Sequence, residues 1–451
     1  MSATTFKGGV HPAEYKELSF GSPVEAYLPK GDLVFPLNQH IGAPAKPVVA
    51  KGDHVLAGQL IAEAGGFVSA NIVSSVSGTV KAIENRTTIS GGRADCIVIE
   101  NDQKYELAPG VGTRRKAEDI SDEIIINAVK AAGIVGMGGA GFPTHVKLMP
   151  KNKNDIKFVI ANGCECEPYI TCDDRLMQDH PRRIVDGLKL VLSLFDNAQG
   201  VVAIEDNKPQ AIKTMQEICA GEPRISVQVV QTKYPEGGER NLISVISGRD
   251  LHLGQLPADV GSIVCNVASL NAIYDAVYKS TPLMERYFTI SGDAVKNPKT
   301  VIAKIGTSAS ELVEAAGGLK DGATVKKVLC GGPMMGIAMG TLDVPIQKAN
   351  NALTLMTTDP VEEAEKVQTA CIRCGRCARV CPIHLVPQMM ARDAENGDYE
   401  HYEKIYGLDC ISCGSCSYVC PSKRPLMQTF KQAKAVIMAR KKAEKAAAAA
   451  K

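Results

Sequence analysis

Eight of the 15 cysteines lie in two copies of one pattern, C-x2-C-x2-C-x3-C-P. The copies read CIRCGRCARVCP at 371–382 and CISCGSCSYVCP at 410–421. Three thiolates spaced by two residues can bind one face of an iron–sulfur cubane, and in bacterial runs of this spacing the fourth cysteine ligates the other cluster. The pattern therefore predicts two [4Fe-4S] clusters with exchanged fourth ligands. The predicted sets are Cys371, Cys374, Cys377 and Cys420 for one cluster, and Cys410, Cys413, Cys416 and Cys381 for the other.

A pair of zinc knuckles is the alternative interpretation of these cysteines. Zinc takes four ligands as two C-x2-C pairs, and a third cysteine at the same spacing, repeated twice before Cys-Pro, fits that arrangement poorly. The segments at 384–407 and 427–451 have helical composition, with a break near Asn396–Gly397. We therefore expect an α-helical ferredoxin-like module in which electrons enter one cluster and leave the other.

A second stretch with chemical potential is GIVGMGGAGFPTHVKL at 133–148. Glycines at 136, 138, 139 and 141 would let backbone N–H groups approach a phosphate closely. A helix starting near Pro143 would favour an anion at its N-terminus, and Lys147 could reach a phosphate. A tight structural turn explains the glycines equally well, because the stretch is not a regular G-x-G-x-x-G after a strand.

Polar side chains follow an apolar strand candidate at 158–161. Asn162, Glu165 and Glu167 come directly after it, where ligands bind in open α/β sheets. The segment 263–277 similarly runs from strand to helix, with Asn266 at the junction. Three further cysteines are expected to be buried or free thiols, since their spacing lacks a fourth metal ligand: Cys164, Cys166 and Cys172.

GGAGFPTHVK at 138–147 is similar to the Gly-rich loop of the flavin-bearing, NADH-oxidising subunit of respiratory complex I. Over nearly its full length the chain resembles more closely the C subunit family of Rnf electron-transport complexes. The motifs that match that family are FKGGVHPAEYKEL, GGAGFPTHVKL, GGPMMG and the two cysteine motifs. The resemblance implies two [4Fe-4S] clusters, FMN and NAD(H) as cofactors, and a peripheral place on the cytoplasmic side of the cell membrane.

The same resemblance implies which residues bind FMN and NAD(H). Phe142 would stack on the adenine, and Glu165, the candidate catalytic residue, would lie near the nicotinamide and the flavin. The chain departs from the complex I pattern where Cys164 replaces an Asp, Gly238 a Glu and Cys265 an Asn. The implied cofactor-binding set is Gly136, Gly138, Gly139, Gly141, Phe142, Lys147, Asn162, Glu167, Tyr234, Gly237, Gly238, Glu239 and Asn266.

The implied activity is electron transfer between NAD(H) and ferredoxin, coupled to Na+ or H+ translocation by partner subunits. NAD(H) exchanges a hydride and a cluster one electron, so a flavin belongs between them. The expected partners are an iron–sulfur electron-transfer subunit and integral membrane subunits of an Rnf-type complex. Two alternatives are a soluble cobalamin reductase of a bacterial microcompartment and a non-catalytic two-cluster electron carrier. Copurification with membranes would separate the Rnf-type subunit from the soluble reductase, and the absence of NADH-reducible flavin would support the electron carrier.

Composition and patterning predict a multidomain α/β and α+β chain. A net charge of +2 and the absence of Trp argue against a nucleic-acid partner. No run reaches the roughly 20 apolar residues of a membrane span, and the first 20 residues lack a signal-peptide core. The expected divisions are an N-terminal extension (1–25), an unmodified barrel-sandwich domain (26–110), a Rossmann-like FMN/NAD(H) domain (118–280), a β-grasp domain (281–350), a linker (351–369), the 2[4Fe-4S] module (370–430) and a basic helical tail (431–451).

Overall fold

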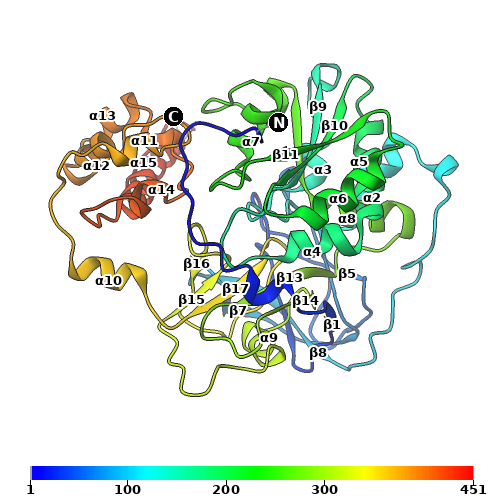
Figure 1. Ribbon diagram of the computed structural model, residues 1–451. Helices are drawn as coiled ribbons and strands as arrows, with labels where there is room; N and C mark the ends of the chain where they lie inside the picture. Colours follow the sequence, from blue (N-terminus) through cyan, green and yellow to red (C-terminus); the bar gives the residue numbers. More distant parts are fainter. Residues whose placement is uncertain (1–2, 450–451) are drawn as a thin grey trace.

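The computed structural model describes residues 3–449. Four sheets and a helical module are arranged along the chain, with the helical module beside the parallel sheet and joined to the six-stranded sheet by an extended connection (Figure 1). None of the helices between residues 3 and 449 combines the length and apolar character that crossing a membrane requires.

A four-stranded parallel sheet forms the centre of the domain expected to bind FMN, and its strand order is β11-β10-β9-β12. Val159, Ile160 and Ala161 on β9 are fully buried, as is typical of a parallel strand with helices on both faces. The predicted strand at 158–161 and the strand-to-helix junction at Asn266 are both confirmed. The strands are β9 (Phe158–Gly163), β10 (Gln199–Glu205), β11 (Ile225–Val230) and β12 (Ser262–Asn266).

Helices cover this sheet and begin where its strands end. Asn266 accepts a hydrogen bond from the Ala268 N–H and so caps α8, while Pro181 and Pro209 stand in the first turns of α5 and α6. The helix expected after the Gly-rich stretch is a single turn, α3. The helices of this domain are α2 (Asp122–Ala131), α3 (Thr144–Lys147), α4 (Cys172–Asp179), α5 (Pro181–Ser193), α6 (Pro209–Cys219), α7 (Glu239–Ser247) and α8 (Val267–Lys279).

Two small antiparallel sheets enclose one apolar core and form the expected barrel-sandwich. Leu33, Phe35, Val80 and Ile97 are fully buried between them. One sheet has the order β2-β8-β7-β4, with β2 (Leu33–Pro36), β8 (Arg93–Asn101), β7 (Gly78–Thr87) and β4 (His54–Val55). The other contains β3 (Lys46–Pro47), β5 (Leu60–Glu63) and β6 (Ile72–Val73).

The β-grasp region is a six-stranded sheet that recruits strands from outside the expected boundaries 281–350. Residues 351–369, expected to be a linker, contain β17, which pairs with β13 and β15 inside this sheet, and the helix α10. All five residues of Ala352–Met356 are buried, which explains why they form a strand. The elements are β1 (Glu25–Tyr27), β13 (Glu285–Ser291), β14 (Lys299–Lys304), α9 (Ala309–Ala315), β15 (Lys327–Cys330), β16 (Ile337–Ala338) and β17 (Ala352–Met356).

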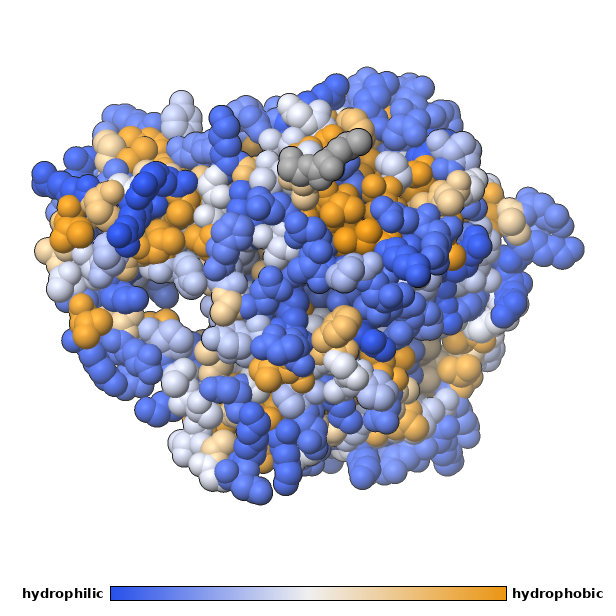
Figure 2. Space-filling model, in the orientation of Figure 1, coloured by the Kyte–Doolittle hydropathy of each residue, from blue (hydrophilic) through white to orange (hydrophobic). Residues whose placement is uncertain are grey.

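The cysteine-rich module is helical, as expected, and the predicted break near Asn396–Gly397 separates α12 from α13. The connection to it passes through α10, which is mostly hydrophilic and is separated from the body by an opening (Figure 2). Buried Met390, Tyr402 and Phe430 form the module's own apolar core. The helices are α10 (Pro360–Lys366), α11 (Arg376–Arg379), α12 (Pro387–Glu395), α13 (Tyr399–Lys404), α14 (Ser415–Tyr418) and α15 (Leu426–Ala449).

Candidate functional site

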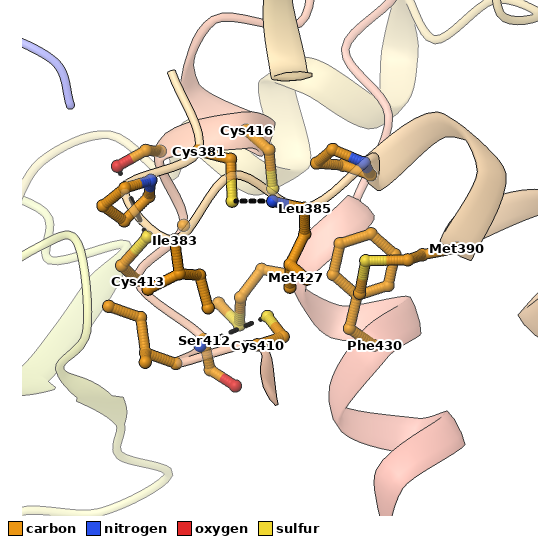
Figure 3. A pocket seen from close by; sticks show the side chains of 15 residues that line it. Cys381, Ile383, Leu385, Met390, Cys410, Ser412, Cys413, Cys416, Met427 and Phe430 are labelled. Atoms are coloured by element: carbon orange, nitrogen blue, oxygen red, sulfur yellow. Dashed lines mark hydrogen bonds between the residues drawn. The ribbon is translucent and has the colours of Figure 1, made fainter. Parts of the chain in front are cut away.

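Four cysteines predicted to bind one cluster surround a single cavity in the helical module. Three come from the second motif and Cys381 comes from the first, so the structure brings together the set with the exchanged fourth cysteine. We call Cys381, Cys410, Cys413 and Cys416 the inner cysteine set. Their side chains lie around the cavity together with Ile383, Leu385, Met427 and Phe430 (Figure 3). A protected, largely apolar site of this kind limits solvent access, which is one determinant of a cluster's potential.

The other four cysteines, Cys371, Cys374, Cys377 and Cys420, are the outer cysteine set. Thr369 N donates to Ser422 O at 3.1 Å and Ser422 Oγ donates to Ala370 O at 2.9 Å, so the start of the first motif lies beside the end of the second. Burial raises the pKa of the Cys377 thiol, and negative charge on neighbouring Cys420 raises it further. Cys371 and Cys374 are exposed.

The two motifs repeat in backbone conformation as well as in sequence. Equivalent residues are 39 positions apart, since 410 − 371 and 420 − 381 both equal 39. Cys371 Sγ accepts a hydrogen bond from Arg373 N at 3.4 Å, and Cys410 Sγ accepts one from Ser412 N at the same distance. Such N–H···S bonds stabilise thiolate ligands and tune cluster potentials. Three equivalent pairs have positive φ: Arg373 and Ser412, Gly375 and Gly414, and His384 and Lys423. The cysteine arrangement therefore fits two cubanes.

The inner cysteine set faces the parallel-sheet domain. Tyr234 Oη donates to the backbone carbonyl of Cys413 at 2.8 Å, and both residues are buried. Arg240 approaches Asp409 at 3.5 Å, next to Cys410 in the sequence. In the outer set, by contrast, Cys371 and Cys374 are exposed.

The Gly-rich stretch forms a closed loop with open backbone amides at its tip. Gly136 N donates to Phe142 O at 2.8 Å, and Gly141 N donates to Gly136 O at 3.1 Å. Gly138 and Gly139 are exposed, and a Cβ placed on Gly139 would meet nothing within 4 Å. Gly139 has φ +113°, which strongly favours glycine. Phe142 is half-buried at the end of the loop.

The predicted asparagines lie side by side at the carboxyl edge of the sheet. Asn162 on β9 and Asn266 on β12 are paired in register. Asn162 Nδ2 donates to Gly237 O at 2.9 Å, and Asn266 Nδ2 donates to Asp173 Oδ2 at 2.7 Å. A Cβ on Gly138 would lie 3.6 Å from the Asn266 side chain, so the Gly-rich loop covers this edge.

The loop at 234–239 completes the same edge. Lys147 Nζ donates to Val264 O at 2.6 Å and lies 3.3 Å from Glu239 Oε1. Gly237 packs so closely that a Cβ would lie 2.2 Å from Cys164 O. Gly238 stands at the start of α7, whose first N–H groups have no side-chain cap. Open loop amides, a helix start and asparagine amides form a donor set that suits a phosphate and a flavin ring, so the residues present fit FMN.

Glu165 lies near this edge, but its carboxylate points into the protein. Oε1 accepts hydrogen bonds from Asp173 N at 2.8 Å and from Cys172 Sγ at 3.3 Å, so Glu165 caps the start of α4. The Glu165, Cys172 and Asp173 ligand atoms all lie within 4.8 Å of one another. Burial, and then the charge of Glu165, raise the pKa of Asp173 to about 7. The structure places Glu165 as a buried positioning group, and a contact with nicotinamide stays a prediction.

Glu167, a predicted cofactor-binding residue, hydrogen-bonds to a loop of another domain, and its contact with a cofactor stays a prediction. Its carboxylate accepts hydrogen bonds from Met334 N at 3.1 Å and Met335 N at 2.7 Å, in the GGPMMG loop of the six-stranded sheet. Burial raises the pKa of Glu167 to about 7. A Cβ on Gly414 would lie 3.2 Å from Met334 O, so this loop connects Glu167 to the cysteine motif at 410–421.

Several residues that hold the site were not predicted from the sequence. Asp173 lies in the first turn of α4, in the run CDDR. This acidic run could have indicated the start of a helix. Lys348 Nζ donates to Gly133 O at 2.8 Å from another domain, and Ile41 N donates to Gly141 O at 3.1 Å from the barrel-sandwich. Such long-range contacts leave no local pattern. Cys164 and Cys172 are buried, as expected, and Cys166 is half-buried.

Four family models match successive parts of the chain. Residues 4–104 match the RnfC barrel-sandwich hybrid domain, and residues 129–275 match the Nuo51 FMN-binding domain. Residues 287–338 match the SLBB domain, and residues 370–424 match the 4Fe-4S dicluster domain. The cofactors of this chain are therefore FMN and two [4Fe-4S] clusters, with NAD(H) as the fitting substrate.

Similar proteins cover nearly the whole chain. The C subunit of the proton-translocating ferredoxin:NAD(+) oxidoreductase complex of Clostridium ljungdahlii is 43% identical, covering 98% of this chain and 96% of its own. The Na(+)-translocating counterpart from Acetobacterium woodii is 40% identical, covering 97% and 98%. A solved NAD+-reducing [NiFe]-hydrogenase in the air-oxidized state has 21% identity and a TM-score of 0.46, covering 64% of this chain and 54% of that one.

Proposed function

This chain belongs to the family of C subunits of ion-translocating ferredoxin:NAD(+) oxidoreductase (Rnf) complexes, and on that premise we propose that it is the NAD(H)-oxidoreductase subunit of such a complex. It is an electron-transfer subunit with an FMN-binding domain and a dicluster domain. Particular residues hold the flavin and each cluster, the two clusters act in a fixed order, and electrons leave through one surface of the helical module.

The flavin site we propose is the carboxyl edge of the parallel sheet. FMN, when bound, exchanges two electrons with NAD(H) and single electrons with iron–sulfur clusters. The open amides of Gly138 and Gly139 would bind its phosphate, while Gly136 and Gly141 close the loop with their own hydrogen bonds. Asn162 and Asn266 would bind its ring. Lys147 adds a positive charge that is already held against Glu239 at 3.3 Å. The half-buried ring of Phe142 would contact the adenine of NAD(H), and Glu165 would keep α4 and Asp173 in place below.

One observation supports the order of the clusters: Tyr234, in the loop that lines the proposed flavin site, donates to the carbonyl of Cys413 at 2.8 Å. The inner cysteine set is thus the one next to the flavin site. The outer set holds the exposed Cys371 and Cys374, the ligands most accessible to another protein. We therefore place the inner cluster between the flavin site and the outer cluster.

The exit surface surrounds the outer cysteine set. Ile372 is 65% exposed and lies in the same motif as Arg373, Arg376 and Arg379. An exposed apolar residue in a motif with three arginines suits an electron-transfer partner whose docking surface carries acidic residues, because charge complementarity steers association. We propose an iron–sulfur subunit of the complex as that partner and integral membrane subunits as the ones that move Na+ or H+. In this proposal the chain is peripheral, on the cytoplasmic side of the membrane.

An anaerobic NADH titration of the purified full-length chain tests the proposal. We expect about eight irons per chain, the content of two cubanes, and NADH-dependent bleaching of a flavin band followed by loss of cluster absorbance. Iron without NADH-reducible flavin would leave a two-cluster carrier and contradict the oxidoreductase assignment. Full activity without membrane copurification would favour a soluble reductase instead.

A further inference from the structure

The N-terminal segment runs between the helical module and the parallel-sheet domain before it joins the six-stranded sheet (Figure 1). We call residues 4–20 the N-terminal strap. At its start, Thr4 bridges Val230 at the end of β11, and Thr5 Oγ1 donates to Glu236 Oε2 at 2.7 Å. Val10 exchanges two backbone hydrogen bonds with Tyr234, at 2.8 and 2.9 Å. The strap therefore extends the edge of the parallel-sheet domain next to the proposed flavin site.

The same few residues touch the inner cysteine set on their other side. Gly9 N donates to Val380 O at 2.9 Å, and a Cβ on Gly8 would lie only 2.8 Å from Cys381 O. Val10 is buried in one cluster with Tyr234 and Cys413. Residues 8–10 thus fill the junction between the loop at 234–239 and two members of the inner set.

Glycine is required at this junction for two reasons. Gly8 and Gly9 have φ +91° and +77°, and a Cβ on Gly9 would lie 2.8 Å from Tyr234 O. Any side chain would push the strap away from the carbonyls on either side. Buried Lys233 holds the preceding turn, because its ammonium donates to Phe6 O and lies 4.2 Å from the centre of the Phe6 ring.

Further along, the strap holds the loop that follows β9. Lys16 Nζ donates to the carbonyls of Glu165, Glu167 and Ile170 at 2.8, 3.0 and 2.6 Å. Tyr15 stacks on Tyr169 with ring centres 4.8 Å apart. One continuous segment therefore contacts the inner cysteine set, the loop at 234–239 and the loop that contains Glu165.

We propose that the N-terminal strap is a positioning element that sets the separation between the flavin site and the inner cysteine set, and so the rate of electron transfer between them. This inference rests on the proposed function, since it assumes that these two sites exchange electrons. Electron transfer between buried centres depends steeply on distance, so a small shift of the module would change the rate without changing NADH binding.

The test compares Gly8→Ala with Gly91→Ala in the full chain with its cofactors bound. Gly91 is exposed with φ +78° and nothing within 4 Å of an added Cβ, so it reproduces the backbone strain without the contact. For Gly8→Ala we expect flavin bleaching at the wild-type rate but slower cluster reduction, because only the second step depends on the separation of the flavin site from the inner cysteine set. Gly91→Ala should behave as wild type.

Hydrogen exchange provides a readout that does not depend on activity. In Gly8→Ala the amides of Gly9 and Val10 should exchange at least about tenfold faster, which corresponds to a loss of about 1.4 kcal/mol. If Gly8→Ala loses iron, Lys233→Met is the second variant, because it releases Phe6 without changing a cysteine motif. Slower cluster reduction in Lys233→Met supports the proposed role of the strap. Cluster reduction at the wild-type rate in an iron-loaded variant whose Gly9 and Val10 amides exchange faster overturns the proposal, and wild-type exchange in both variants contradicts the contacts on which it rests. Failure of NADH to reduce the clusters of the unmodified chain would contradict the proposed function, while the exchange experiment would still report on the strap.

Discussion

The cysteine motif at 371–382, which we call the outer motif, and the one at 410–421, the inner motif, have one spacing and one backbone conformation, yet different surroundings. Cys413 and Cys416 are 7–8% exposed, whereas the equivalent Cys374 and also Cys371 lie open to solvent. Local sequence is sufficient for the ligand loop, because the same positive-φ positions recur in both copies. Which copy is buried depends on contacts with residues far away in the chain, among them Val10 and Tyr234.

The residues between the cysteines differ between the two motifs in a way that matches this difference in burial. Arg373 and Arg376 in the outer motif correspond to Ser412 and Ser415 in the inner one, at the same 39-residue offset. Ser415 is fully buried, while Arg376 is exposed. A small hydroxyl can be buried with a hydrogen bond, but a guanidinium needs water or a counter-ion. One copy of the repeat therefore suits burial and the other suits solvent.

The largest expected effect comes from removing one ligand from each set. Cys413→Ser should lower the iron content from about eight to about four per chain and leave NADH able to bleach the flavin while the outer cluster stays oxidised. Cys374→Ser, the matched variant, should also lose about four irons but leave the inner cluster reducible by NADH. Iron analysis and low-temperature EPR after NADH addition measure both. The reverse pattern would mean that the outer set is the one next to the flavin site.

The next effect comes from exchanging the residues that differ between the motifs. Ser415→Arg would bury an unpaired charge and should lower the free energy of unfolding by about 3 kcal/mol or more. Arg376→Ser at the equivalent exposed position should change it by no more than about 0.5 kcal/mol. Denaturant unfolding monitored by cluster absorbance compares the two. Equal effects would show that the difference in burial has no energetic basis in these side chains.

Much of this arrangement could be predicted from sequence because local patterns specify it. The spacing of the cysteines predicts both ligand sets, of which the inner one lies around a single cavity, and the apolar run before Asn162 predicts β9. The Ser and Arg residues between the cysteines also distinguish the buried motif from the exposed one, a signal that the predictions from sequence did not include. In contrast, Lys16 and Lys348 each bind carbonyls of distant segments. Strand β17 pairs with β13, although β14, α9, β15 and β16 lie between them in the sequence. No short window of sequence contains such contacts.

A smaller effect should follow the pH dependence of Glu167, which connects the loop after β9 to the GGPMMG loop beside Gly414. Its pKa is raised from 4.5 to about 7 by burial, so between these two values the folded chain holds a proton that the unfolded chain has lost. Its contribution to stability is therefore present at low pH and is lost as the pH rises through this window. Glu167→Gln should gain about 2 kcal/mol relative to wild type between about pH 5 and about pH 8, measured by denaturant unfolding at both pH values.

A difference in stability between Glu167→Gln and wild type that does not change with pH would contradict the raised pKa of Glu167. Glu236 supplies the internal control, because burial also raises its pKa to about 7. The Glu167→Gln variant should therefore still lose stability with rising pH through Glu236 and Asp173, whose pKa is also raised to about 7, but should lose less than wild type.

The smallest effect on stability should come from Ile372, the isoleucine that follows the first cysteine of the motif at 371–382. Ile372 is 65% exposed, so Ile372→Ser should change the free energy of unfolding by less than about 0.5 kcal/mol. It should nevertheless slow electron transfer to the partner subunit, because the residue lies at the centre of the proposed exit surface. Stopped-flow reduction of the partner subunit by the NADH-reduced chain measures this rate.

Ile411→Ser is the matched variant. Ile411 packs against the cluster formed by Val10, Tyr234 and Cys413, so its loss should cost about 1–2 kcal/mol and leave the exit surface unchanged. One side chain, at one position of a repeat, would then serve partner recognition in the outer copy and domain packing in the inner copy. If Ile372→Ser left transfer to the partner unchanged, the exposed loop would have no part in docking, and the exit surface would have to be sought elsewhere around Cys374.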